Sequence, residues 1–158
     1  MTVRAAGLED AGLILELVRE LAVFERAPDS VAATAEDYRR ELASAQPGFG
    51  CLIAELDGGP VGFALYHYNY STWTGRRGIY LEDLFVRDRA RGRGVGRRLL
   101  VELARIAVAR GCPRLELSVL DWNPARRFYE GLGFRWKHDW LGYRLDGDRL
   151  AALAASGP

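Results

Sequence analysis

The run Ile79-Tyr80-Leu81-Glu82-Asp83-Leu84-Phe85-Val86, followed closely by Arg91-Gly92-Arg93-Gly94-Val95-Gly96, decides the fold. The first run is an apolar strand interrupted by two acids, and the second is a glycine-rich turn. Apolar residues at helical spacing from Val95 to Arg110 predict an amphipathic helix after the turn. Leu115–Leu120 is then predicted as a strand. This order predicts a crossover that places the two strands roughly parallel.

The remaining sequence predicts hairpins before the crossover and short elements after it. Asp57-Gly58-Gly59-Pro60 is a hairpin signal, because Asp-Gly tolerates the positive φ angles of a tight turn. The predicted elements are a strand at 2–5, helices at 8–24 and 35–43, strands at 51–56 and 61–70, a helix from 123–124 to about 131, and closing strands at Phe134–Trp136 and Leu141–Leu145. The fold class is therefore α/β, with a mixed, mostly antiparallel sheet flanked by helices.

Length and composition are those of one globular domain, which we expect to span residues 1–158. The N-terminus lacks the apolar core of a secretory signal, and no apolar stretch approaches the roughly 20 residues that span a bilayer. We therefore expect a cytoplasmic protein with no membrane partner. Cys51 and Cys112 are too few for a disulfide framework, and His67 and His138 lack ligand spacing, so no metal is predicted.

The net charge of +1 is a sum of unequal parts. Residues 1–75 carry 5 basic and 11 acidic side chains, whereas residues 76–98 carry 8 basic and 3 acidic ones. A short basic segment in a nearly neutral chain indicates a local anion site rather than a surface for nucleic acid, so no nucleic-acid partner is expected.

The glycine-rich turn is suited to a phosphate or pyrophosphate. Glycine lets the backbone approach a ligand, and a helix N-terminus offers unpaired N–H groups and the positive end of its dipole. The turn is neither a Walker loop nor a regular dinucleotide fingerprint, since Arg97 stands where the third glycine belongs. Two alternatives are a variant dinucleotide site, with Glu116 on the ribose, and a basic turn that only caps the helix.

The strand and turn together resemble the acetyl-CoA-binding core of the GNAT superfamily of N-acetyltransferases. Arg91, Gly94 and Gly96 meet its Arg/Gln-x-x-Gly-x-Gly/Ala signature. Three further segments resemble the diamine acetyltransferase branch of the family, which includes spermidine/spermine and thialysine enzymes. They are Tyr70-Ser71-Thr72-Trp73-Thr74-Gly75, Leu120-Asp121-Trp122-Asn123 and Phe128-Tyr129-Glu130-Gly131-Leu132-Gly133. The likeness covers roughly residues 3–150. It implies the GNAT-like acyl-CoA N-acyltransferase fold, with a splayed strand pair that binds the cofactor.

The resemblance also implies a set of residues for the co-substrate, acetyl-CoA. In this family the pyrophosphate lies on the glycine turn and the pantetheine arm pairs with the preceding strand. The implied cofactor residues are Leu84, Phe85, Val86, Arg91, Gly92, Arg93, Gly94, Val95, Gly96, Arg97, Asn123 and Tyr129. Asn123 is interpreted as a helix cap that also contacts the pantetheine.

Acetyl transfer requires a neutral amine and a proton for the departing thiolate. An alkyl ammonium has a pKa of about 10.4, so it must lose a proton before it attacks. Glu82 is the candidate acceptor, through water, and its alternative is a solvated or ion-paired strand residue. The family resemblance makes Tyr129 the candidate general acid; without it, Tyr129 is core packing.

A cationic amine requires carboxylates and aromatic faces. Glu25, Trp73, Glu82 and Asp83 are the substrate-binding candidates, although Glu25 is alternatively a surface charge and Trp73 a core or dimer-packing residue. Strand alternation predicts that Asp83 points away from the face of Glu82. Ser71 stands where the polyamine enzymes carry an acid, which favours a smaller amine than spermidine or spermine.

The resulting hypothesis is direct acetyl transfer from acetyl-CoA to a primary amine of a small diamine, polyamine or lysine-like molecule in a ternary complex. The resemblance implies a homodimer. The alternatives are a GNAT enzyme for protein amino groups or antibiotics, and a noncatalytic sensor of CoA or a nucleotide.

Overall fold

The computed structural model describes residues 1–157. The chain divides into two compact units, Met1–Ser118 and Val119–Pro158. The first unit contains the sheet. Its strands are β1 (Thr2–Ala5), β2 (Gly50–Leu56), β3 (Gly59–Ser71), β4 (Arg76–Val86) and β5 (Leu115–Leu117), and its helices are α1 (Ala11–Phe24), α2 (Ala35–Ala43) and α3 (Val95–Ala109). Three short 3-10 turns complete it: η1 (Leu8–Asp10), η2 (Pro28–Ser30) and η3 (Asp88–Ala90).

The five strands lie in the order β1-β2-β3-β4-β5. The pairs β1–β2, β2–β3 and β3–β4 are antiparallel, and β4–β5 is parallel. The predicted mixed, mostly antiparallel sheet and the predicted parallel crossover are therefore confirmed. β5 is shorter than expected, because its ladder with β4 ends at the pair Leu81 and Leu117.

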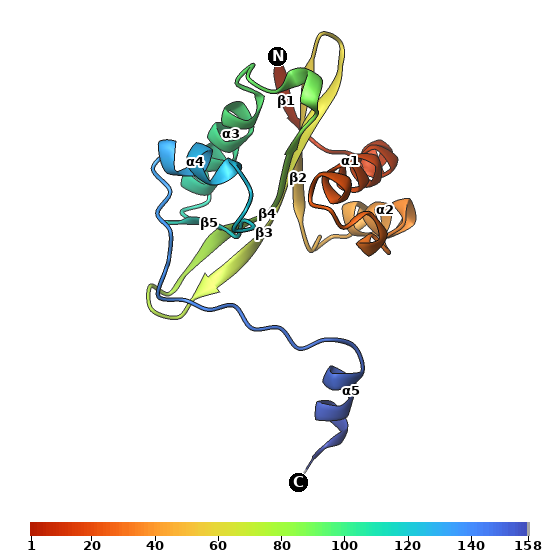
Figure 1. Ribbon diagram of the computed structural model, residues 1–158, viewed down its shortest axis with the longest axis vertical. Helices are drawn as coiled ribbons and strands as arrows, with labels where there is room; N and C mark the ends of the chain where they lie inside the picture. Colours follow the sequence, from red (N-terminus) through yellow and green to blue (C-terminus); the bar gives the residue numbers. More distant parts are fainter. Residues whose placement is uncertain (158) are drawn as a thin grey trace. The chain divides into compact units, whose positions relative to one another are not determined.

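Helices cover both faces of this sheet (Figure 1). α1 packs its apolar stripe of Ile14, Leu17 and Leu21 against Cys51, Ile53, Phe63, Leu65 and Phe85 of β2 to β4. α3 lies on the opposite face and buries Val95, Leu99 and Leu103. The α3 stripe is the one that the helical periodicity predicted.

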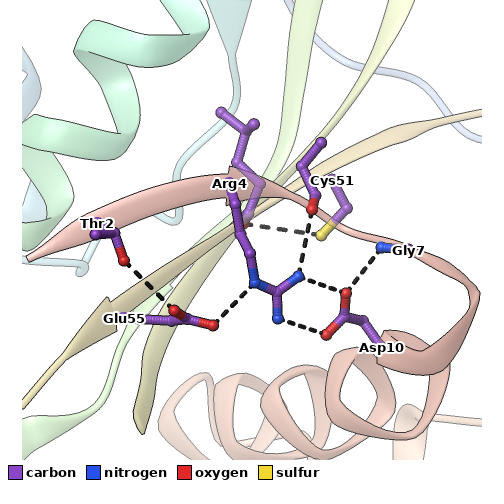
Figure 2. Close-up of polar contacts among 8 residues, drawn as sticks. Thr2, Arg4, Gly7, Asp10, Cys51 and Glu55 are labelled. Carbon is purple, nitrogen blue, oxygen red and sulfur yellow. Dashed lines mark hydrogen bonds and ion pairs between the residues drawn. The ribbon is translucent and has the colours of Figure 1, made fainter. Parts of the chain in front are cut away.

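A partly buried ion pair joins β1 to the start of α1 (Figure 2). The Arg4 guanidinium donates two hydrogen bonds to the Asp10 carboxylate, at 2.7 and 2.8 Å, and a third to Glu55 at 2.9 Å. The Gly7 N–H donates to Asp10 at 2.8 Å. Asp10 is only 4% exposed, and the hydrogen bonds from Arg4 hold its pKa below the ordinary value.

The second unit contains α4 (Ala125–Gly131) and α5 (Gly147–Ala155). The predicted closing strands Phe134–Trp136 and Leu141–Leu145 are wrong: both segments are extended or irregular chain without a ladder. Apolar alternation makes a segment fit for a strand, but a strand also needs a partner backbone. α5 was not predicted, although its run of alanine and leucine favours a helix.

Candidate functional site

A bulge interrupts the regular ladder of β4 at the two acids of the strand. Leu65 pairs with Asp83 and the next residue, Tyr66, pairs with Leu81, so Glu82 is an extra residue on β4. A bulge interrupts the alternation of side chains along its strand. Asp83 shares the face of its partner Leu65. Glu82 lies against His67, which is two residues from Leu65 and therefore on the same face.

Glu82 and Asp83 thus share one face of the sheet, and the prediction that they point to opposite faces is wrong. The face is the one that α1 covers, since Leu65 belongs to the core beneath that helix. The extra residue at the bulge is the physical reason, because it shifts the alternation by one position.

Three carboxylates form an acidic cluster on this face: Glu25, Glu82 and Asp83. Burial, helped by the negative charges of Glu82 and Glu25, raises the pKa of Asp83 to about 6. Burial also raises the pKa of Glu25, which follows the last residue of α1. Within residues 1–157 neither Asp83 nor Glu25 forms an ion pair with a cationic side chain. The cluster is therefore suited to a cation from solution.

The edge of β4 next to this cluster is open. Pairing with β5 stops at Leu81, whereas β4 continues to Val86. The Arg87 N–H points to β3, where it donates to the Val61 carbonyl at 2.8 Å. Backbone groups alternate sides along a strand, so those of Leu84 and Val86 point to the open edge. An extended ligand with amide groups can pair there.

The glycine-rich turn follows this edge and leads into α3. Gly92 and Gly94 have φ angles of +74° and +79°, which favour glycine over residues with a side chain. Gly94 is the N-cap of α3, and no side chain caps that end. The first N–H groups of a helix have no partner within it, so this end is suited to an anion.

The arginines of the turn differ in what they contact. Arg91 lies over the Phe24 ring at 4.8 Å from its centroid and donates from Nε to the Val86 carbonyl at 3.0 Å, so its side chain braces the end of β4. Arg93 forms an ion pair with Asp57 in the β2–β3 turn at 2.8 Å. Arg97 is exposed and has no such partner among the described residues, which leaves its guanidinium available to an anion.

The remaining predicted site residues belong to the second unit and to the turn between β3 and β4. In the second unit, the Asn123 side chain accepts a hydrogen bond from the Ala125 N–H at 2.9 Å, which is a helix-capping contact. Tyr129 is buried, and its ring packs edge-on against Phe134. Trp73 is 91% exposed in the turn between β3 and β4, so it is not a core residue. It lies about 20 Å along β4 from Glu82, at roughly 3.4 Å per residue, and the structure does not bring it to the acidic cluster.

Sequence reasoning missed His67, whose imidazole lies beside Glu82. Its Nε2 is 3.4 Å from Glu82 Oε2, and its ring is stacked on Tyr80. A lone histidine in a strand carries no motif, and the contact depends on the bulge. The described residues contain no group of three potential metal ligands and no helix long and apolar enough to cross a membrane.

Comparisons with known proteins agree on one family. Residues 14–134 match the acetyltransferase (GNAT) family model. The chain is 38% identical over 164 residues to the thialysine N-epsilon-acetyltransferase of Sus scrofa, covering 96% of each protein. It is 41% identical over 93 residues to an L-ornithine N5-acetyltransferase of Arabidopsis thaliana, covering 58% of this chain and 41% of that protein.

A solved structure shares nearly the whole fold. An integron cassette protein from the mobile metagenome of V. cholerae superposes with a TM-score of 0.82 at 28% sequence identity, covering 98% of each chain. The similarity therefore spans both the sheet unit and the C-terminal unit of the chain.

Proposed function

The chain belongs to the acetyltransferase (GNAT) family, and on that premise we propose that it acetylates a primary amine of a small diamine, polyamine or lysine-like molecule. As a family member it is an acetyltransferase that acts on amines, with acetyl-CoA as co-substrate. The proposed class of amine substrate rests on one observation, the cluster of Glu25, Glu82 and Asp83. Among the described residues its half-buried acid has no cationic partner, and the cluster lies beside the open edge of β4.

The residues beside the cluster fit acetyl-CoA, which supplies an activated acetyl thioester. The open backbone groups of Leu84 and the Val86 N–H can pair with the amides of an extended arm, while the Val86 carbonyl accepts from Arg91. The N-terminus of α3, with the positive-φ turn before it, suits a pyrophosphate. Among the arginines, Arg97 supplies the available charge, and Arg91 acts by holding the Val86 end of the strand.

We assign the proton steps to Glu82 and Tyr129. The Glu82 carboxylate accepts a proton from the substrate ammonium through water, which frees the nitrogen lone pair to attack the acetyl carbon. As the new N–C bond forms and the C–S bond breaks, the Tyr129 hydroxyl donates a proton to the departing thiolate. The acetylated nitrogen then loses its second proton, which returns through water to the Tyr129 oxygen. The role of Tyr129 rests on its place in the family motif, with Asn123 capping the same helix.

Asp83 and Glu25 bind the amine substrate in this proposal. A half-buried carboxylate without a cation partner gains more from an ammonium group than a solvated one does, because water screens it less. Relatives named for thialysine and ornithine acetylation both act on a side-chain terminal amine. A lysine-like substrate is therefore favoured within the class. Trp73 stays a candidate only for a longer substrate, since it is far along β4.

The proposal extends to assembly and location. We take residues 1–158 as one acetyltransferase domain, because the family match runs across the boundary between the two units. Cys51 and Cys112 are free thiols, which fits a reducing compartment such as the cytoplasm. A homodimer is expected from the family, and sedimentation of the purified protein measures it.

Release of CoA thiol over a panel of amines tests the function. The panel contains lysine, thialysine, ornithine, a short diamine, spermidine, a lysine peptide and an aminoglycoside. We expect the highest kcat/KM for a lysine-like amine, and about a 100-fold loss of kcat in Glu82→Gln and in Tyr129→Phe with unchanged affinity for acetyl-CoA. A preference for the peptide or the aminoglycoside would contradict the substrate class. Tight CoA binding without release above hydrolysis would contradict amine acetylation.

A further inference from the structure

His67 occupies a fixed place beside the bulge of β4. It is directly opposite Tyr80 in the β3–β4 ladder, and its ring is stacked on the Tyr80 ring at a centroid distance of 5.2 Å and an angle of 28°. The Tyr80 hydroxyl donates in turn to Ser118 Oγ at 2.6 Å, just after β5. The imidazole is thus held against a ring that is itself tied to the next segment of the chain.

Glu82 needs such a neighbour because little else restrains its side chain. It is the extra residue of the bulge, and its side chain is 55% exposed. Among residues 1–157, the His67 imidazole is the one side-chain partner found for its carboxylate, with 3.4 Å between Nε2 and Oε2. A long acidic side chain loses rotamer entropy when it is held in one orientation, so a contact that restrains it beforehand lowers that cost during reaction.

We infer that His67 is a positioning residue for the reaction: it holds the Glu82 carboxylate in the orientation from which that group accepts the substrate proton. The inference rests on the proposed role of Glu82. His67 neither gains nor loses a proton in this role; the proton passes from the ammonium through water to Glu82. The ionisable groups that face the imidazole are Glu82 and Tyr80, and the negative charges of Glu82 and Glu25 act on Asp83.

Two substitutions separate the polar contact from the stack. His67→Phe keeps a ring against Tyr80 but removes Nε2, whereas His67→Gln keeps an N–H donor for the carboxylate. We expect His67→Phe to lower kcat for the preferred amine about tenfold, with KM for acetyl-CoA unchanged. His67→Gln should recover most of that loss. Thermal unfolding of both variants, which should match the wild type within a few degrees, controls for folding.

The same substitution in a second background shows whether His67 acts through Glu82. In Glu82→Gln, adding His67→Phe should lower kcat by less than twofold, because there is no carboxylate left to orient. A full tenfold loss in that background, or a wild-type kcat for His67→Phe alone, overturns the inference while leaving the role of Glu82 intact. A wild-type kcat for Glu82→Gln alone overturns the proposed role of Glu82, and that of His67 with it.

Discussion

Asp10 and Asp83 lie in the same unit of the chain, and each follows a glutamate, yet they have opposite electrostatic settings. Asp10 receives two hydrogen bonds from Arg4 and one from the Gly7 N–H, and its pKa is lowered. Asp83 has two acids nearby and no cation among the described residues, and its pKa is raised to about 6. The first carboxylate is satisfied by the fold. The second has no such partner among the described residues, and we propose that this difference marks the substrate site.

The largest expected effect is a loss of stability when the paired acid, Asp10, is replaced. Asp10→Ala leaves the Arg4 guanidinium with only Glu55 as its acidic partner and removes the acceptor of the Gly7 N–H. We expect a loss of about 2.5 kcal/mol in the free energy of unfolding, measured by urea denaturation, because Asp10 accepts charge-assisted hydrogen bonds and the Gly7 N–H loses its acceptor. The kcat/KM of the protein that remains folded should be unchanged, because Asp10 is not part of the acidic cluster. A normal stability for this variant would show that the ion pair is not what anchors β1 to α1.

An intermediate effect is expected when the unpaired acid loses its charge. Asp83→Asn keeps the size of the side chain but removes the negative charge offered to the amine. We expect kcat/KM for the amine to fall about thirtyfold, or about 2 kcal/mol, mainly through KM, and KM for acetyl-CoA to stay the same. Steady-state kinetics with each substrate varied in turn measures both. If both KM values rose together, Asp83 would be a structural residue of the whole site.

The smallest effect concerns stability and its dependence on pH. The pKa of Asp83 is higher in the folded chain than in the unfolded one, so folding takes up a proton at this group. The free energy of unfolding therefore decreases as the pH rises from about 4 to about 6. At pH 7, Asp83→Asn should therefore stabilise the protein by about 1 kcal/mol, after allowance for the buried amide.

At pH 4 the stabilisation by Asp83→Asn should disappear. Asp10 has the opposite dependence of stability on pH. Its lowered pKa contributes stability above pH 4 that is lost as the pH falls towards the folded-state value. Urea denaturation of the wild type and of Asp83→Asn at a series of pH values separates the two trends. An equal difference between the two proteins at every pH would contradict a raised pKa for Asp83.

The sequence alone predicts the features of the site that local patterns determine. The apolar spacing of Val95 to Arg110 predicts α3, and the glycines before it predict a turn, which the structure confirms. In that turn Gly92 and Gly94 adopt left-handed φ angles. The parallel crossover follows from the handedness of strand–helix–strand units. These predictions depend on residues close together in the chain.

Features that depend on distant residues could not be predicted in the same way. The bulge at Glu82 is set by pairing with β3, and it moves Glu82 to the face of Asp83 against simple alternation. The ion pair of Arg93 with Asp57 joins two turns that are far apart in sequence. The predicted strand at Leu141–Leu145 had the right composition, but no ladder forms there.

The most direct test of the account is the titration of the two aspartates by carbon NMR of their carboxyl groups, with and without saturating thialysine. Without ligand, Asp83 should titrate near pH 6 and Asp10 below its ordinary range. With thialysine bound, the account predicts that the pKa of Asp83 falls by at least about one unit while that of Asp10 stays unchanged, since an ammonium group then lies beside Asp83 alone. An Asp83 pKa that does not move on binding would contradict the claim that the unpaired carboxylate is where the amine binds.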